Sequence, residues 1–168
     1  MLFKPELIEK ILGYEKTQTR RIALLGDEYK VLEIDYRTKE ISYAWVKRNG
    51  RMKWRVGQTY ALQLGRGKPR IGRRIEIISI RKQFLQGITE ADAIAEGFAS
   101  IAEFAAYWDK INGKKKGYAW ADNPTVWVLE FELIPTGDYR DARGCLEWDG
   151  EPAEKTIRRL RGYKEDEL

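Results

Sequence analysis

Residues 13–21 read Gly13-Tyr14-Glu15-Lys16-Thr17-Gln18-Thr19-Arg20-Arg21, and they concentrate two threonine hydroxyls, one carboxylate and three cations behind a brief amphipathic segment. The sequence contains no histidine and one cysteine. A Ser-His-Asp triad, a Cys-His pair and a histidine-ligated metal site therefore cannot be built from this single chain. Any catalysis must use lysine, hydroxyl and carboxylate groups.

Lys16 and Thr19 form the first catalytic candidate in this stretch. They are three residues apart, so they share one face if the stretch is helical or forms a turn. A lysine that is partly removed from water can lose its proton and then deprotonate a hydroxyl nucleophile. The alternative interpretation is that the cations complement the carbonyls at the end of the preceding helix, while the threonines lie in a solvated turn.

The composition fits one globular domain with a sizeable core, because 43% of the 168 residues are hydrophobic and 12% are aromatic. Lysine and arginine outnumber the acidic residues by 31 to 26, which favours polyanionic partners such as RNA. The lone Cys145 rules out an intramolecular disulfide framework. With no secretory segment and no apolar run of membrane-spanning length, we expect a cytoplasmic protein, monomeric or weakly dimeric, that needs no membrane, metal or cofactor.

The first half of the chain predicts a short helix followed by strands. Pro5 suits the first turn of the helix, and Gly13 is expected to end it in a left-handed conformation. Residues 31–36 and 41–46 alternate apolar and polar side chains, as the two strands of a hairpin do, and residues 59–64 read as a further strand. The apolar stripe of the helix comprises Leu7, Ile8, Ile11 and Leu12.

A glycine-rich basic segment follows at residues 65–74. It holds three glycines and five cations, so backbone amides and guanidinium groups can both approach a phosphate. It matches neither a Walker A loop nor the dinucleotide-binding pattern. The alternative is a solvated connection between two strands, whose charges only improve solubility.

The second half predicts a central strand and two helices. Residues 74–84 read as a long strand. Thr89 then caps a short helix that runs through Glu96, and Ser100 begins a capping box that opens a second helix. A carboxylate at the end of a helix opposes the partial negative charge there. We therefore expect a cation beside Glu96, for which Lys16 is the candidate; a solvated Glu96 is the alternative.

The last regular element is a strand at residues 125–133, which alternate in polarity. Five or six strands with helices inserted between them, and no repeating strand-helix rhythm, predict an α+β fold built on a small mixed β-barrel. We expect residues 1–134 to form this domain. Residues 135–168 would be a C-terminal extension, made of a loop and a short basic helix.

These elements resemble an ASCH domain of the PUA-like superfamily over roughly residues 1–134. The pattern is most similar to small bacterial amidohydrolases that deacylate N4-acetylcytidine, whose signature is a glycine, then Lys-Thr-x-Thr-x-Arg, then a glutamate in the helix after the central strand. This chain departs from the signature by placing Glu15 between the glycine and the lysine, by longer connections between strands and by its C-terminal segment. The resemblance rests on the helix ending at Gly13, Lys16-Thr17-Gln18-Thr19 with Arg21, the strand leading to Ile88-Thr89-Glu90, Glu96-Gly97-Phe98, and the strand at residues 126–133.

The resemblance implies that Lys16, Thr19 and Glu96 are the catalytic residues and that Arg21 is the motif arginine. In one scheme Thr19 attacks the acyl carbonyl, neutral Lys16 takes the hydroxyl proton and passes it to the departing cytosine amine, and Glu96 orients Lys16. In the other scheme Glu96 activates water, while cationic Lys16 and the Thr19 hydroxyl stabilise the oxyanion. Sequence alone leaves both schemes open.

The substrate would be a modified nucleoside or base. Tyr118, Trp120 and Trp54 are available to stack on a pyrimidine, and Arg20 and Arg21 to contact the substrate. The alternative for the aromatic residues is packing within the barrel. Two other functions stay open: a module that binds RNA or modified bases in the same cleft without catalysis, and an ASCH-type ribonuclease.

Overall fold

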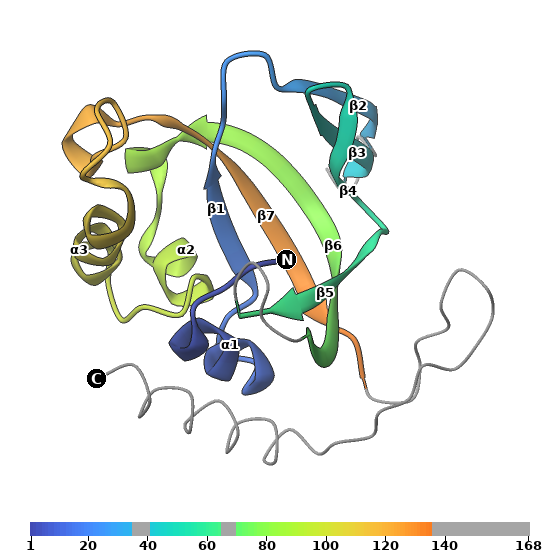
Figure 1. Ribbon diagram of the computed structural model, residues 1–168, viewed down its shortest axis with the longest axis horizontal. Coiled ribbons are helices and arrows are strands. Elements are labelled where there is room, and N and C mark those ends of the chain that lie inside the picture. The colour runs from blue at the N-terminus through green and yellow to red at the C-terminus, as the bar shows by residue number, and fades with distance from the viewer. Residues whose placement is uncertain (35–40, 65–69, 136–168) are drawn as a thin grey trace.

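The structure, a computed structural model, describes residues 1–34, 41–64 and 70–135 (Figure 1). Within these ranges it contains seven strands, three α-helices and two short 3-10 helices. Three of the expected features lie outside the described residues: the hairpin turn at residues 37–40, the glycine-rich part of the basic segment at residues 65–69, and nearly all of the C-terminal extension.

A four-stranded antiparallel sheet occupies the centre of the molecule (Figure 1). Its strands lie in the order β1 (Gln18–Ile22), β7 (Thr125–Leu133), β6 (Arg70–Phe84) and β5 (Thr59–Gln63). The long strand and the closing strand that the sequence predicts are therefore the two interior strands. β6 begins four residues earlier than expected, because it continues its pairing with β5 as far as Arg70.

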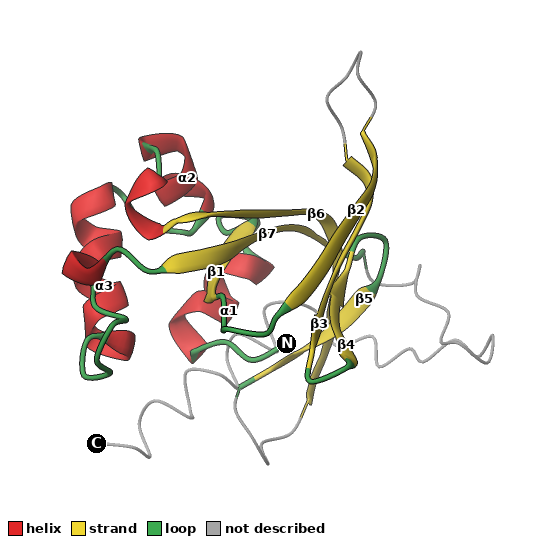
Figure 2. Ribbon diagram, turned by 90° about the horizontal axis from the view of Figure 1, so that it is seen from above, coloured by secondary structure: helices red, strands yellow, loops and turns green. Residues whose placement is uncertain are grey.

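A second antiparallel sheet of three strands stands at a steep angle to the first (Figure 2). It is formed by β2 (Glu28–Ile34), β3 (Ile41–Arg48) and β4 (Arg51–Arg55). Asn49 and Gly50 connect β3 to β4 with φ angles of 52° and 71°, as a tight hairpin turn requires. Together the two sheets curl into a half-barrel, which confirms the expected α+β barrel fold.

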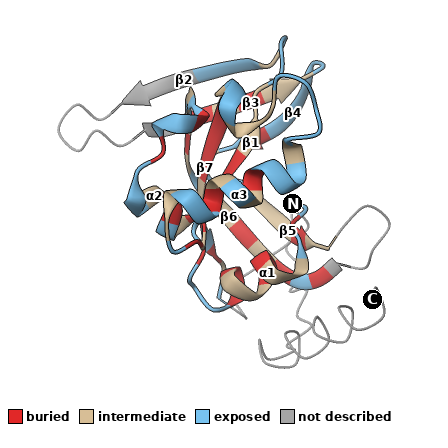
Figure 3. Ribbon diagram, turned by 90° about the vertical axis from the view of Figure 1, so that its left-hand side faces the viewer, coloured by how far each residue is buried: buried red, intermediate tan, exposed pale blue. Residues whose placement is uncertain are grey.

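β7 separates two hydrophobic clusters. Val126 and Val128 belong to the cluster beneath the helices, whereas Trp127 and Leu129 belong to the cluster against the three-stranded sheet. Successive side chains of a strand point to opposite faces, so one strand can serve both clusters. Figure 3 shows the buried residues concentrated along β6 and β7.

Three helices cover the first cluster, and all three were predicted. α1 (Pro5–Leu12) buries its apolar stripe, and α2 (Glu90–Ala95) and α3 (Ile101–Asn112) follow β6. The hydroxyl of Thr89 accepts from the backbone N–H of Asp92, and that of Ser100 from Glu103, as expected of helix caps. The capping box expected at Ser100 is only half formed, because the Glu103 carboxylate accepts from Ala99 N instead of Ser100 N. None of the helices in the described ranges is long and apolar enough to cross a membrane. The 3-10 helices are Leu85–Gly87 and Trp120–Asp122.

Two local expectations at residues 13–21 were wrong. Gly13 has a φ of −84°, and the left-handed residue that ends α1 is Tyr14, with a φ of 62°. Residues 18–22 form β1 rather than a helix or turn. The reason is pairing with β7, in which Thr19 lies opposite Leu129, because backbone partners in a distant strand outweigh a local turn preference.

One carboxylate joins the three-stranded sheet to the rest of the fold. Asp27 accepts two hydrogen bonds of 2.7 Å from the guanidinium of Arg48 in β3, and its Oδ2 accepts from Trp127 Nε1 in β7 at 2.9 Å and from Leu24 N at 3.0 Å. Its side chain is 2% exposed. Burial alone would raise the pKa of Asp27, but the hydrogen bonds from Arg48, Leu24 and Trp127 outweigh it and lower the pKa from 3.8 to about 2.

We expect Asp27→Asn to lower the free energy of unfolding by about 2 kcal/mol at pH 7, because it removes the charged acceptor that binds Arg48, Trp127 and the backbone of Leu24. Since the folded-state pKa is depressed, the contribution of Asp27 is fully present above pH 3.8 and is lost as the pH falls through about 2. Urea denaturation between pH 7 and pH 2.5 measures both effects. The variant should lose this part of the pH dependence, whereas exposed Glu132→Gln should keep it; equal curves for Asp27→Asn and wild type would contradict the assignment.

Candidate active site

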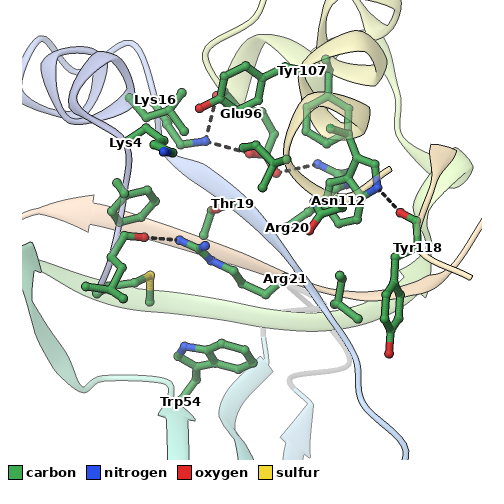
Figure 4. A pocket seen from close by; sticks show the side chains of 18 of the residues that line it. Lys4, Lys16, Thr19, Arg20, Arg21, Trp54, Glu96, Tyr107, Asn112 and Tyr118 are labelled. Carbon is green, nitrogen blue, oxygen red and sulfur yellow. Dashed lines mark hydrogen bonds and ion pairs between the residues drawn. The ribbon is translucent and has the colours of Figure 1, made fainter. Parts of the chain in front are cut away.

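A pocket of about 740 Å³ opens between β1, the N-terminal segment, α2 and α3, and the three-stranded sheet (Figure 4). All three residues of the expected catalytic trio, Lys16, Thr19 and Glu96, line it. Trp54 from β4 and Tyr107 from α3 also contribute to its walls. The pocket therefore collects side chains from segments that are widely separated in the sequence.

Backbone hydrogen bonds fix the position of Lys16 independently of its side-chain contacts. Its N–H donates to Lys10 O at 3.2 Å, and the adjacent Thr17 bridges two elements: its N–H donates to Ala95 O in α2 at 2.9 Å, and its carbonyl accepts from Phe131 N in β7 at 2.8 Å. The loop between α1 and β1 is thus attached to α2 and β7. This attachment directs the Lys16 side chain toward the end of α2.

The ammonium of Lys16 meets three acceptors. Nζ donates to Glu96 Oε2 at 2.7 Å, to Gln18 O at 2.7 Å and to Glu96 O at 2.8 Å. Both partners of the ion pair are almost fully buried, with side-chain exposures of 1% and 3%. An ammonium has three donors, so every donor of Lys16 is used. The cation also compensates for the carboxylate at the end of α2, an arrangement that the sequence suggested for Glu96.

Glu96 reaches Lys16 because of the residue that follows it. Gly97 has a φ of 86°, a left-handed conformation that turns the chain away from α2 directly after Glu96. A Cβ at position 97 would lie 3.0 Å from Lys10 Cδ and 3.4 Å from Lys16 Cβ. Glycine therefore lets the end of α2 approach the Lys16 segment closely.

Gln18 and Arg20 lie on one side of β1 and form a second polar layer. Arg20 Nη1 donates to Gln18 Oε1 at 2.6 Å and to Glu96 Oε1 at 3.2 Å, and its Nη2 lies 3.0 Å from Asp92 Oδ2. Gln18 Nε2 donates to Asp92 Oδ1 at 3.0 Å. Arg20 lines the pocket, but these contacts engage its guanidinium with protein acids. The expected substrate-binding role is thus not apparent from its contacts, which instead hold Glu96.

The pKa of Lys16 is shifted by its surroundings. Burial lowers the pKa below its usual value, because water no longer solvates the ammonium; the contact with Glu96 raises it, and the charges of Arg21 and Arg20 lower it. The net direction is downward. A neutral fraction of Lys16 is therefore available at a lower pH than for an exposed lysine.

Thr19 and Arg21 occupy the other side of β1, since successive side chains in a strand alternate. Thr19 is buried, at 5% exposure, and lines the pocket. Arg21 is half-buried; its Nη2 donates to Leu2 O at 2.7 Å, and its guanidinium lies 5.0 Å from the ring centre of Phe3. In Figure 4 both side chains lie on the cavity side of the strand.

The three aromatic candidates separate into two groups. Trp54 and Tyr118 line the pocket, but Trp54 is 5% exposed and also belongs to the hydrophobic cluster against the three-stranded sheet. Trp120 does not belong to its lining; its ring packs edge-on against Phe104, with ring centres 6.3 Å apart. For Trp120 the structure agrees with the alternative interpretation, that of an aromatic residue packed into the fold.

The expected phosphate-binding segment is also divided. Residues 65–69 lie outside the described part of the chain, and the remainder belongs to β6. Arg73 is buried, and Arg74 donates to the hydroxyl of Thr59 from Nε and Nη2 at 3.1 and 2.9 Å. Arg74 therefore supports the pairing of β5 and β6, and neither arginine lies in a loop.

Several residues of the pocket wall were not predicted from the sequence. Met1, Leu2 and Phe3 reach it because the N-terminal segment pairs with β5, where Leu2 forms a parallel bridge with Gln63. No sequence motif predicts the contact between the N-terminal segment and β5. Arg48 and Lys53 flank Trp54 and could have been suggested by their position in the basic segment around that tryptophan. Tyr107 hydrogen-bonds to Glu6 at 3.2 Å; burial, with Glu6 adding to it, raises its pKa.

Comparison with known proteins identifies the fold. No protein-family model and no curated protein matches the chain. Among solved structures, the ASCH domain of Lactobacillus crispatus JV V101 superposes with a TM-score of 0.50 and 19% identity, over 76% of this chain and 70% of that one. Protein EF3133 of Enterococcus faecalis V583, described as DUF984, gives a TM-score of 0.49 and 14% identity, over 77% and 67%. The fold is that of an ASCH domain, as expected from the sequence.

The close approach at Gly97 provides a test of the site. Gly97→Ala should destabilise the protein by about 1–2 kcal/mol from the left-handed conformation alone, and it should also move Lys16, whose Cβ is 3.4 Å from the new methyl group. Gly57→Ala is the matched control, because Gly57 has a φ of 76° and nothing within 4 Å of its added Cβ. Both variants are compared by urea denaturation and by the Lys16 side-chain signals in NMR spectra. Equal effects at the two positions would contradict this packing.

Proposed function

We propose that this protein is an amidohydrolase that removes the acyl group from N4-acylated cytosine or cytidine, with Lys16, Thr19 and Glu96 as its catalytic residues. The observation that carries the proposal is the buried ion pair between Lys16 and Glu96, 2.7 Å apart, in the wall of a pocket that Thr19 also lines. The ASCH fold and the Lys-Thr-x-Thr-x-Arg pattern of residues 16–21 support it.

In the first half of the reaction, neutral Lys16 accepts the hydroxyl proton of Thr19 while Thr19 Oγ1 attacks the acyl carbonyl carbon. The tetrahedral intermediate collapses when the bond between the carbonyl carbon and the exocyclic nitrogen breaks. The ammonium of Lys16 then donates its proton to that nitrogen. The products of this half are the cytosine base with its amino group restored and an ester between the acyl group and Thr19.

In the second half, water attacks the ester and gives its proton to neutral Lys16. The second tetrahedral intermediate releases Thr19, which recovers a proton from Lys16 as the carboxylic acid leaves. One water is consumed per amide bond, and the site returns to its starting state. Lys16 acts as base and then as acid in each half, which suits a lysine whose pKa lies below its usual value.

This route requires Lys16 to change its hydrogen bonds. As an ammonium it donates to three acceptors; after losing a proton it keeps two donors and gains a lone pair. One acceptor must therefore be released, and the lone pair must face Thr19. Glu96 Oε1 also binds Arg20, so the carboxylate is held while the amine reorients. Because both carboxylate oxygens already bind cations, Glu96 is better placed to orient Lys16 than to deprotonate water.

A second candidate function is the binding of modified bases or RNA in the same pocket without catalysis. The observation that favours it is the complete use of the three Lys16 donors, since a fully satisfied ion pair is also what a purely structural contact looks like. The two candidates differ in whether the bound base leaves the pocket chemically changed.

The trio is tested by hydrolysis of N4-acetylcytidine, followed by the change in ultraviolet absorbance, with a chelator present. We expect wild type to be active and Thr19→Ala, Lys16→Met and Glu96→Gln each to lose at least about 100-fold in kcat/KM. Thr17→Ala is the matched control, because Thr17 is the exposed threonine of the same stretch. An acylated Thr19 should appear by mass spectrometry after rapid quenching. Binding without hydrolysis by wild type would favour the second candidate.

The role of Lys16 as base predicts a pH dependence. Activity should rise with pH as Lys16 becomes neutral, and because burial lowers its pKa, the rise should be centred below the ordinary value of 10.5. Glu96 raises the pKa of Lys16, so Glu96→Gln should move the remaining rise in kcat/KM to lower pH. Exposed Glu132→Gln serves as the control and should leave the profile in place. A shift to higher pH in Glu96→Gln would contradict this assignment.

A further inference from the structure

The charges of the pocket wall are strongly unbalanced. Seven cationic side chains but one carboxylate, that of Glu96, are found among the described residues that line it. A neutral nucleoside carries no negative charge that could balance these cations. The seven cations are Lys4, Lys16, Arg20, Arg21, Arg48, Lys53 and Lys115.

Three of the seven cations are neutralised within the protein. Lys16 and Arg20 bind Glu96, and Arg20 also binds Asp92. Arg48 binds Asp27 at 2.7 Å. For Lys4, Arg21, Lys53 and Lys115, the described part of the chain supplies no carboxylate within ion-pair distance. The pocket therefore retains positive charge that its own acids do not balance.

Arg21 is the most informative of these four. It is half-buried against Phe3, and among the described residues one acceptor, Leu2 O at 2.7 Å, is found for its five N–H donors. Burial lowers the pKa of Arg21, because the cation has lost part of its hydration. Removing a cation from water without a counter-ion costs free energy. An anion bound in the cavity would offset that cost and use the free donors.

A second group of cations lies around Trp54. The Lys53 ammonium is 5.6 Å and the Arg48 guanidinium 5.7 Å from the ring centre of Trp54, and all three residues line the same pocket as Arg21. Figure 4 shows Trp54 across the cavity from Arg21. This end of the pocket thus has cations on two walls, with the buried Trp54 between Arg48 and Lys53, which suits a phosphate group attached to a nucleoside.

We infer that Arg21 and Lys53 form an anion subsite for a phosphate group, and that the acylated cytidine enters as a phosphate-bearing nucleotide unit rather than as a free nucleoside. This inference rests on the proposed function for the identity of the base. Thr19 and Arg21 share one side of β1 and are two residues apart, so their Cα atoms are separated by about 6.6 Å along the strand. The acyl group would lie at Thr19 and the phosphate beyond Arg21, toward Lys53. The phosphate comes either from a free nucleotide or from an RNA chain.

Calorimetric titration with the reaction products tests the subsite without requiring hydrolysis. We expect cytidine 5′-monophosphate to bind about tenfold more tightly than cytidine, and this preference to shrink as salt is raised. Lys53→Glu should reduce the preference by about fivefold or more. Arg51→Glu is the matched control, because it changes the charge by the same amount on the same strand. Arg51 is exposed and is not part of the pocket lining. The control variant should keep the preference.

The outcomes separate this inference from the proposed function. Equal affinity for nucleotide and nucleoside, or equal effects of Lys53→Glu and Arg51→Glu, would overturn the subsite even if N4-acetylcytidine is hydrolysed. Preferential nucleotide binding that depends on Lys53, in a protein that hydrolyses no acylated cytidine, would retain the subsite and reject the amidohydrolase. Tighter binding of a short RNA carrying N4-acetylcytidine than of N4-acetylcytidine 5′-monophosphate assigns the phosphate to RNA, and the reverse order assigns it to a nucleotide.

Discussion

The rest of the site depends on the buried contact between the Lys16 ammonium and the Glu96 carboxylate. Two charges removed from water are stable only when their remaining hydrogen-bonding groups are also satisfied. Here two backbone carbonyls complete the coordination of the ammonium, and Arg20 occupies the second carboxylate oxygen. The partners are 80 residues apart, so the contact depends on the pairing of β1 with β7 and on the position of α2. The ion pair is thus a result of the completed fold.

The two faces of β1 lie in different surroundings. On one side, Gln18 and Arg20 connect Glu96 to Asp92, and Arg81 extends the network by binding Asp92 at 2.9 Å. On the other side, Thr19 and Arg21 face the cavity. The alternation of a strand therefore separates the side chains that hold Glu96 from the side chains of Thr19 and Arg21 on the cavity side. A helix or turn, the condition under which Lys16 and Thr19 would share a face, would have mixed the two sets.

The predictable parts of the fold were those with local signals. Pro5, Thr89 and Ser100 mark helix starts by chemistry that acts within one turn, and the alternation of residues 125–133 identifies β7 in full. The placement of Glu96 beside a cation was also suggested locally, by the carboxylate at a helix end. Contacts between distant segments carried no such signal: the bridge from Leu2 to β5, the cations at Trp54 and the pairing that extends β6 to Arg70 all depend on tertiary structure.

The two walls of the pocket belong to two different sheets. One wall, attached to the four-stranded sheet, contains Lys16, Thr19 and Arg21. The other wall comes from the three-stranded sheet, which Asp27 connects to β7 by a hydrogen bond, and contains Arg48, Lys53 and Trp54. In the proposed reaction, Lys16 and Thr19 are therefore attached to the four-stranded sheet, and the inferred phosphate subsite draws Arg21 from that sheet and Lys53 from the three-stranded one. Substitutions in the three-stranded sheet can alter the shape and charge of its wall while the buried ion pair keeps its geometry. If the proposed function holds, changes confined to the hairpin of β3 and β4 would adapt the pocket to new ligands and leave the Lys16–Glu96 contact unchanged.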